Sequence, residues 1–276
     1  MTKKPLPTLM EIRAAHEWKR DYERYLPLSR YLFRPVGFLL TWVSIQIGLA
    51  SETISWLSGV VGLVACLCLL STQELLLPFG IGFLLFFNLL DCVDGSMARV
   101  LKTENPYGKF LDSLMGFIDM AFWAVIGVIA YNHPQLLFFS DPLGYGSIFW
   151  LVAGGLTSYF FILLGYVENI FDHSIRDEWN NMKKKIRDAS NISNNKLEED
   201  LYKANLTFTP LSIMRRINHN LRVRETHYFF LILAYLGSMV DLFLFSFLLF
   251  YAFSTLFLIL VYSIRGRKLR SFQSKQ

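Results

Sequence analysis

Long apolar blocks without Lys or Arg constrain the fold of this chain more than any other feature of its sequence. Hydrophobic residues make up 53% of the 276 residues, and over most of the chain they do not recur at the period of an amphipathic helix or strand, as they do in soluble domains. A helix needs about 20 predominantly apolar residues to cross a hydrocarbon core about 30 Å thick. The sequence therefore predicts an all-α fold, a polytopic membrane bundle of helices.

Six blocks have the length and composition of membrane spans. The last two belong to one apolar run from Tyr228 to Ser263, which as a single helix would be about 54 Å long and exceed the bilayer core. A turn at Gly237–Asp241 would divide this run into two short spans. The predicted spans are Thr53–Ser71, Leu75–Leu90, Leu111–Tyr131, Ser147–Tyr166, Tyr228–Val240 and Leu242–Ser263.

The positive charges predict the orientation of these spans. All 27 Lys and Arg residues lie in four parts of the chain, namely residues 1–34, 91–109, 168–226 and 264–276. The connections formed by residues 72–74, 132–146 and 237–241 contain none. Cytoplasmic connections carry an excess of Lys and Arg, so we expect both termini in the cytoplasm. The net charge of +5 is then a topology signal and does not predict nucleic-acid binding.

Two parts of the chain are expected. Residues 1–50 form a cytoplasmic or interfacial segment, and residues 51–276 form a membrane domain with a cytoplasmic insertion at residues 168–226. Val36–Ala50 is apolar enough for a seventh span, but a crossing there would carry the eight N-terminal cations outside. An interfacial or re-entrant helix is the better interpretation of that stretch.

The first part of the chain has the pattern of an amphipathic helix. Apolar residues recur at helical spacing between Leu9 and Leu26, with charged residues between them. Such a helix could lie on the cytoplasmic leaflet or pack on the protein's own cytoplasmic face. No cleavable signal peptide is recognisable in the first thirty residues. We expect a bacterial inner membrane, with the endoplasmic reticulum as the alternative.

A cluster of aspartates stands at the boundary between the second and third predicted spans. The sequence is D-C-V-D-G-S-M-A-R from Asp91 to Arg99 and G-K-F-L-D from Gly108 to Asp112. Asp91 and Asp94 are three residues apart and share one face of a helix. Asp112, one turn into the following helix, can meet them across the helix pair.

Three carboxylates at one membrane boundary would repel each other and lose hydration, and a divalent cation resolves both problems. All-oxygen ligands favour Mg²⁺ or Mn²⁺, so Asp91, Asp94 and Asp112 are the predicted metal ligands. Such an ion would hold a diphosphate, and Arg99 could contact a phosphate oxygen. The small residues that leave room for a ligand near the backbone are Gly95, Ala98 and Gly108.

This pattern resembles the signature of the CDP-alcohol phosphotransferases, D-x-x-D-G-x-x-A-R-x(7–8)-G-x-x-x-D-x-x-x-D. The resemblance implies a homodimeric membrane enzyme with one or two divalent ions, in which the CDP diphosphate lies on the metal and the cytidine lies against the Asp94–Arg99 helix. An acceptor hydroxyl attacks the donor phosphorus and CMP leaves. The residues that it assigns to nucleotide binding are Asp94, Gly95, Ala98, Arg99 and Gly108, and it assigns a catalytic role to Asp112.

The chain departs from the signature in two places. Gly116 replaces the last aspartate, which in the family is thought to be a metal ligand and the general base. Asp119 is the nearest carboxylate in sequence, and we expect it either to contact the acceptor or to make an interhelical hydrogen bond. The other departure precedes the first span, where Ser51–Ser55 stands in place of the Pro-Asn-x-x-Thr of many members.

The sequence thus predicts transfer of a phosphatidyl or substituted-phosphate group in phospholipid or phosphodiester synthesis. CDP-diacylglycerol with a small alcohol is the first donor–acceptor pair, and a CDP-linked polar alcohol with a lipid acceptor is the second. One alternative is a catalytically weak relative that binds a CDP-lipid or serves as a partner subunit, motivated by Gly116. Another is an ion-coupled transporter, although aspartates gathered at one membrane boundary argue against it.

Overall fold

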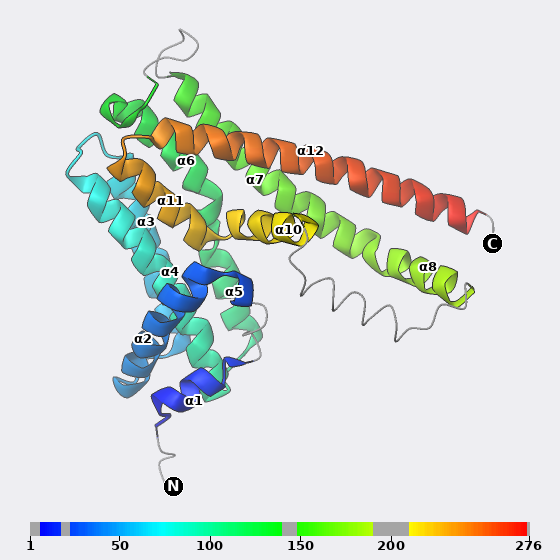
Figure 1. Cartoon of the computed structure of the whole chain (residues 1–276). Coiled ribbons are helices and arrows are strands. Elements are labelled where there is room, and N and C mark those ends of the chain that lie inside the picture. The colour runs from blue at the N-terminus through cyan, green and yellow to red at the C-terminus, as the bar shows by residue number, and fades with distance from the viewer. Residues whose placement is uncertain (1–5, 18–22, 140–147, 190–209, 275–276) are drawn as a thin grey trace.

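The computed structural model describes residues 6–17, 23–139, 148–189 and 210–274, and within these residues the chain forms helices and no β-strand. The helices pack side by side as a bundle, from which α7, α8 and α12 extend together to one side (Figure 1). Among the described residues, five helices, counting α5 and α6 as one, are long and apolar enough to cross a membrane. They are α3 (Ser51–Leu70), α4 (Leu76–Leu101), α5 (Pro106–Met115) continued by α6 (Phe117–Asn132), α7 (Ile148–Ser174) and α12 (Val240–Gln273).

The fifth predicted span, Tyr228–Val240, falls on α11 (Arg224–Leu236). This helix has 13 residues and is about 20 Å long, which is shorter than the hydrocarbon core. The predicted turn is present, because α11 ends at Leu236 and α12 begins at Val240, with Ser238 at a positive φ of 50° between them. The division of the apolar run is therefore confirmed, and the total of six spans stays a prediction.

The three connections without Lys or Arg meet at one end of the bundle. The imidazole Nε2 of His133 lies 2.9 Å from the Ser71 carbonyl oxygen, which joins the α6–α7 connection to the α3–α4 connection. The Asp241 carboxylate accepts the backbone N–H groups of Phe138 and Phe139 at 2.9 and 2.6 Å. This contact joins the α6–α7 connection to the α11–α12 turn. The described parts of the three connections without Lys or Arg therefore lie together, and the side of the membrane on which they lie stays a prediction.

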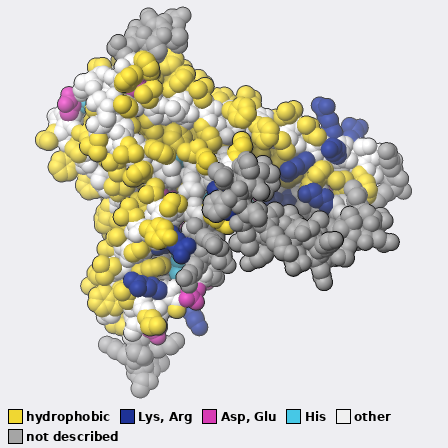
Figure 2. Space-filling view, viewed as in Figure 1, with side chains coloured by type: hydrophobic (Ala, Val, Ile, Leu, Met, Phe, Trp, Pro, Cys, Tyr) yellow, Lys and Arg dark blue, Asp and Glu magenta, His cyan; other side chains and the backbone are white. Residues whose placement is uncertain are grey.

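The helices extend beyond the apolar blocks at the cation-rich end. The second, fourth and last predicted spans end at Leu90, Tyr166 and Ser263, whereas α4, α7 and α12 continue to Leu101, Ser174 and Gln273. Apolar composition marks the part of a helix that suits lipid, and nothing in the polar extensions breaks the helix. On the face drawn in Figure 2, hydrophobic side chains cover much of the bundle, and Lys and Arg gather toward the C-terminal end of α12.

Close backbone contact brings α6 and α7 together. A Cβ added to Gly127 would lie 2.7 Å from the Trp150 carbonyl oxygen and 2.9 Å from the Gly154 Cα, so neither glycine position tolerates a side chain. Small residues are the usual means of bringing transmembrane helices together. Trp123 is fully buried next to this contact and packs on Phe247 of α12, which ties the pair to the last helix.

The N-terminal segment packs on the bundle. Its elements are α1 (Leu9–Ala14), η2 (Glu23–Tyr25), η3 (Ser29–Phe33) and α2 (Arg34–Gln46). Ile12 of α1 is 1% exposed in a cluster with Ile45, Val93 and Met97, which is the packing on the protein's own face that the sequence offered as an alternative. α2 has 13 residues and is not among the helices long enough to cross a membrane. Contact of this segment with lipid stays a prediction.

The predicted cytoplasmic insertion, residues 168–226, includes the end of α7, α8 (Arg176–Ala189) and α10 (Pro210–Leu221). Residues 190–209 of this insertion lie outside the described part of the chain. α10 leads directly into α11, whose first residue, Arg224, reaches the aspartate cluster described below. This insertion therefore contributes to the candidate site as well as connecting two helices.

Candidate active site

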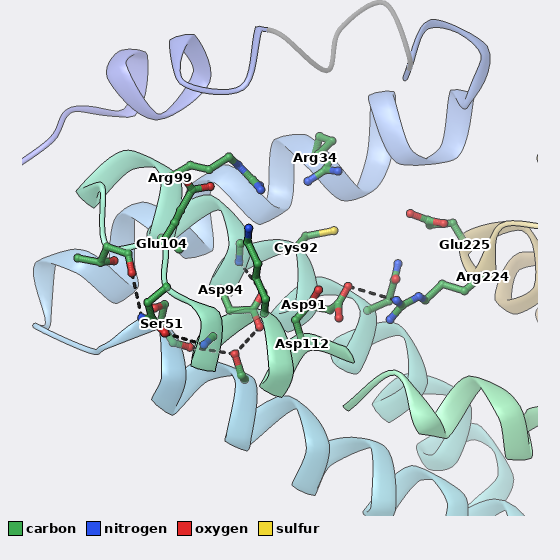
Figure 3. Close-up of a pocket in the computed structure, with 18 of the residues that line it drawn as sticks. Arg34, Ser51, Asp91, Cys92, Asp94, Arg99, Glu104, Asp112, Arg224 and Glu225 are labelled. Carbon is green, nitrogen blue, oxygen red and sulfur yellow. Dashed lines mark hydrogen bonds and ion pairs between the residues drawn. The ribbon is translucent and has the colours of Figure 1, made fainter. Parts of the chain in front are cut away.

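A cavity of about 430 Å³ opens among α3, α4 and α5, with α2 and the start of α11 at its edges. All seven residues that the sequence singles out for metal or nucleotide binding line it. Figure 3 shows Asp91, Asp94 and Asp112 near its centre, with arginines around them on different helices. The residues are Asp91, Asp94, Gly95, Ala98 and Arg99 from α4, and Gly108 and Asp112 from α5. The sequence prediction that these residues converge is thus fulfilled, although their roles are not tested by this geometry.

Asp94 is the most enclosed of the three motif carboxylates, with 5% of its surface exposed. Its Oδ2 accepts the hydroxyl of Ser55 at 2.5 Å, and its Oδ1 accepts the backbone N–H of Gly95. Asp91 and Asp112 lie close enough for their negative charges to act on it. The cavity therefore concentrates negative charge beside a carboxylate that is fixed in place by α3.

The segment that replaces the Pro-Asn-x-x-Thr element also shapes the cavity. Ser51 and Ser55 line it, and Ser55 holds Asp94. Asn105 caps α5 by accepting the Gly108 N–H at 2.7 Å, while its Nδ2 donates to the Glu52 carboxylate at 3.2 Å. These bonds fix the start of α5, and hence Asp112, against α3. The replacement therefore retains a positioning function.

Arg224 is a site residue that the sequence motif does not include. Its Nη2 lies 3.4 Å from an oxygen of Asp91, and its Nε lies 3.4 Å from an oxygen of Asp119. The guanidinium thus bridges two acids on different helices. Because Asp91 is a predicted metal ligand, this arginine and a bound cation would compete for the same carboxylate.

Asp119 does not line the cavity. Besides its pair with Arg224, it accepts a hydrogen bond from the buried Tyr228 hydroxyl at 3.1 Å. This is the interhelical hydrogen bonding that the sequence offered as the alternative to acceptor contact, and the acceptor role stays a prediction. Asp119 also follows a break in the third span, since α5 ends at Met115 and α6 begins only after Gly116.

The donor set suits a hard divalent cation, but it is not assembled as a closed cage. Within the described residues, no group of three His, Cys, Asp or Glu side chains is arranged to hold a metal ion. Asp91, Asp94 and Asp112 nevertheless offer only oxygen atoms to one cavity, which are the ligands that Mg²⁺ and Mn²⁺ prefer. Because Mg²⁺ often keeps several waters and uses substrate phosphates as ligands, a partial protein ligand set fits such an ion.

Residues that line the same cavity carry unpaired N–H donors. Within the described residues, eight buried side-chain nitrogen or oxygen atoms have no hydrogen-bond partner, and four of them belong to residues that line this cavity. Buried donors are normally paired, so their concentration at one place indicates a missing acceptor. All four are N–H donors, namely Arg34 Nε, Asn88 Nδ2, Arg99 Nε and Arg224 Nη1. Such donors match an anion, whereas the carboxylates match a cation.

Three residues of this cavity had no distinct signal in the sequence. Ser55 lies in an apolar span, Arg34 adjoins an apolar stretch, and Arg224 stands among other arginines of the long insertion. What identifies them is tertiary contact with the aspartate helix. A sequence pattern of local spacing cannot report such contacts.

Comparison with protein families agrees with this geometry. The profile described as CDP-alcohol phosphatidyltransferase matches residues 49–187, slightly more than half of the chain and the part that holds α3 to α7 and most of α8. Comparison with curated proteins found no match. The matched residues include the whole aspartate motif and leave out Arg34 and Arg224. The chain therefore belongs to the CDP-alcohol phosphatidyltransferases, integral membrane transferases that generally depend on a divalent metal ion and move a phosphatidyl-type group from a CDP-alcohol to a hydroxyl.

Proposed function

We propose that this protein transfers a phosphatidyl or other substituted-phosphate group from a CDP-linked donor, with CDP-diacylglycerol the first candidate, to the hydroxyl of a small alcohol. The observation that carries the proposal is the composition of one cavity, whose lining includes three carboxylates and four residues that have a buried N–H donor without a partner. A divalent cation together with a diphosphate satisfies both sets. A cation alone or an anion alone would satisfy only one of them.

The carboxylates are assigned to the cation, and the N–H donors are assigned to the diphosphate. Asp91, Asp94 and Asp112 would hold Mg²⁺ or Mn²⁺, which when bound neutralises charge on the diphosphate and polarises its oxygens. Ser55 keeps Asp94 in place, and Arg99 offers an N–H donor to a phosphate oxygen. The small residues that let the nucleotide approach α4 and α5 are Gly95, Ala98 and Gly108.

The transfer exchanges one phosphorus–oxygen bond for another. The acceptor oxygen attacks the phosphorus that carries the lipid or alcohol, and the bond from this phosphorus to the oxygen bridging it to CMP breaks. CMP leaves with the bonding electron pair, and the acceptor hydroxyl loses its proton. Asp112 is the motif carboxylate on α5, the helix that Gly116 follows, and we assign it the contact with the reacting groups.

The proton of the acceptor hydroxyl needs a base other than residue 116, because Gly116 has no carboxylate. Asp119 is the alternative base, and to act as one it would have to exchange its contacts with Tyr228 and Arg224 for the acceptor. A Cβ at Gly116 would meet only the backbone oxygens of Ser113 and Asp112, at 3.4 and 3.6 Å. The Cβ of an aspartate therefore has room at this position.

We also propose an orientation in the membrane, a location and an oligomeric state. Both termini and the cavity would face the cytoplasm, which requires α11 to complete a sixth crossing, and a bacterial inner membrane is the expected location. A homodimer is expected from the family resemblance. The second donor–acceptor pair, a CDP-linked polar alcohol and a lipid hydroxyl, would use the same metal and diphosphate site.

A second candidate function is a CDP-lipid-binding relative with little or no turnover. Gly116 motivates it, because a missing metal ligand and base would affect catalysis more than nucleotide binding. A Gly116→Asp variant tests this candidate. If the wild-type protein binds CDP compounds without turnover and this variant gains turnover, the weak relative is the better description.

The primary test is CMP release by purified protein reconstituted in lipid with Mg²⁺ or Mn²⁺ and a panel of CDP donors and hydroxyl acceptors. We expect release that depends on the metal, on one donor and on one acceptor, and that disappears in Asp112→Ala. Cation-coupled flux without CMP would instead indicate a transporter. Nucleotide binding without CMP from any pair would favour the second candidate.

A further inference from the structure

Arg34 lies outside the family region, yet it lines the reaction cavity. It is the first residue of α2, before residue 49 where the family match begins. Its side chain is 14% exposed. Figure 3 shows it on the same side of the carboxylates as Arg99, away from Arg224. The N-terminal segment thus supplies a cation to a site whose motif residues all come from α4 and α5.

Two buried residues of the N-terminal segment hold Arg34 in place. Its Nη2 lies 2.7 Å from Glu23 Oε1, and the same oxygen lies 3.2 Å from His16 Nε2. The side chains of Glu23 and His16 are only 8% and 6% exposed. Such an enclosed ion pair has a defined geometry, unlike a flexible pair on the surface.

The charge states of this network are set by its surroundings. Burial lowers the pKa of His16, so the imidazole is neutral at neutral pH and can donate its Nε2–H to Glu23. Burial alone would raise the pKa of Glu23, but the bond from His16 and the charge of Arg34 outweigh it and leave this pKa below its ordinary value. Glu23 is therefore a carboxylate, and it fixes one edge of the Arg34 guanidinium.

The Nε of Arg34 is left without a partner. It is buried and makes no hydrogen bond, and the same holds for the Nε of Arg99. The two guanidinium groups are also close enough for their like charges to act on each other, although the negative charges of Glu104 and Asp94 act on Arg99 as well. Two neighbouring cations with unpaired buried donors in one cavity wall are unfavourable unless an anion lies between them. The carboxylates of the cavity do not supply these hydrogen bonds.

On the basis of the proposed function, we infer that Arg34 is a phosphate-binding residue of the donor site, and that Glu23 and His16 are its positioning residues. Arg34 and Arg99 bind diphosphate oxygens from the side opposite the metal-binding carboxylates. A guanidinium suits this task, because it stays charged and presents several N–H donors in a fixed plane. The N-terminal segment is then part of the substrate site and not only a membrane anchor.

Direct nucleotide binding tests this inference. The full-length protein in lipid nanodiscs is titrated calorimetrically with CDP and with cytidine in the presence of Mn²⁺. We expect Arg34→Gln to weaken CDP binding at least about tenfold, since it removes a charge-assisted hydrogen bond to phosphate. Cytidine binding should be unaltered because cytidine has no phosphate. The inference is overturned if CDP affinity is unchanged, or if the loss is equal for cytidine.

Arg30→Gln is the matched control. Arg30 lies on the same segment and, with Arg34, lines a neighbouring cavity, but it does not line the reaction cavity. This variant removes the same charge, so CDP affinity should stay within about twofold of wild type. An equal loss in both variants would mean that general charge attraction accounts for the effect, and would overturn the assignment of Arg34.

Glu23→Gln tests the positioning role. This variant keeps the Arg34 charge and loses its ion pair, so we expect CDP affinity between those of the wild type and Arg34→Gln. Adding Glu23→Gln to Arg34→Gln should cause no further loss, because a positioning residue acts only through the residue it holds. Additive losses would overturn that role.

Two further results separate the possible failures. Thermal unfolding without nucleotide identifies any variant that does not fold. If Arg34→Gln does not fold, Arg34→Lys replaces it. We expect this variant to lose part of the CDP affinity, because lysine keeps the charge but lacks the planar donors. If wild-type protein binds no CDP in the presence of Mn²⁺, the proposed function fails and this inference fails with it. If wild type binds CDP and releases CMP while the Arg34 variants bind normally, only the inference fails.

Discussion

Buried aspartates stand at both ends of this bundle, and their surroundings differ. At the end without Lys or Arg, Asp241 is 0% exposed and its two oxygens accept the backbone N–H groups of Phe138 and Phe139. At the other end, Asp94 is 5% exposed and shares a cavity with Asp91 and Asp112. The first acid is fully paired within the protein, whereas the second belongs to a group with excess negative charge.

This difference teaches that burial of a carboxylate does not by itself indicate function. Asp241 joins two connections, and its hydrogen bonds account for its presence. A hydroxyl and a backbone N–H hold Asp94, and one arginine pairs with Asp91, in a cavity whose lining residues also include N–H donors without partners. A site is indicated where several like charges and unpaired donors gather in one cavity.

The largest expected effect is on the rate of transfer, for a substitution at the end of the bundle that holds the cavity. Asp94→Asn keeps the size of the side chain and removes one charge from the proposed metal site, so CMP release should fall about 10³-fold, or roughly 4 kcal/mol of transition-state stabilisation. Initial rates with saturating Mg²⁺ measure this. Ser55→Ala, which removes only the hydroxyl donor to Asp94, should cost about tenfold or less. A fall of less than tenfold in Asp94→Asn would contradict its role as a ligand.

A substitution at the opposite end should lower the stability of the protein and leave the rate of CMP release unchanged. Asp241→Asn replaces one of two acceptor oxygens with an N–H₂ group that faces a backbone N–H, so the free energy of unfolding should drop by about 2–3 kcal/mol. Equilibrium unfolding in mixed micelles of mild detergent and SDS measures the change. CMP release per folded molecule should remain that of wild type. If Asp241→Asn kept its stability and lost CMP release, Asp241 would have a role in the reaction, and the comparison between the two ends would be wrong.

Asp119 is the third buried acid to compare. The change in free energy expected from its substitution is the smallest of the three. It is paired with Tyr228 and Arg224 outside the cavity lining, so Asp119→Asn should lower CMP release by no more than about tenfold, through displacement of Arg224. Tyr228→Phe, which removes the other partner and leaves the carboxylate, is the matched comparison. A loss in Asp119→Asn as large as that of Asp94→Asn, with activity retained in Tyr228→Phe, would instead make Asp119 the base for the acceptor.

The sequence was sufficient for the parts of the fold that depend on local composition. Apolar blocks predicted where α3, α4, α7 and α12 lie, and the length of the apolar run from Tyr228 to Ser263 predicted the turn before α12. The spacing of Asp91, Asp94 and Asp112 predicted their convergence on one cavity. Each of these signals lies within a single helix or two consecutive helices, where periodicity and helix geometry decide the outcome.

What the sequence could not provide depends on packing between distant helices. The hydroxyl of Ser55 meets Asp94 across 39 residues, and Arg224 reaches Asp91 from a helix near the other end of the chain. Each of these side chains has many equivalents in the sequence, and only the arrangement of α2, α3 and α11 around α4 selects them. The length of α11 was also not predictable, because its apolar run continues into the next helix.

The most direct test of this account is Mn²⁺ binding by the purified protein, measured from the electron paramagnetic resonance signal of free Mn²⁺. Wild type, Asp112→Ala and Asp241→Asn are compared at equal folded concentration. The account predicts that wild type and Asp241→Asn bind Mn²⁺ with the same affinity, and that Asp112→Ala binds at least about tenfold more weakly because an oxygen ligand is lost. Equal binding by all three proteins, or loss of binding in Asp241→Asn alone, would contradict the assignment of the metal site to the aspartate cluster of α4 and α5.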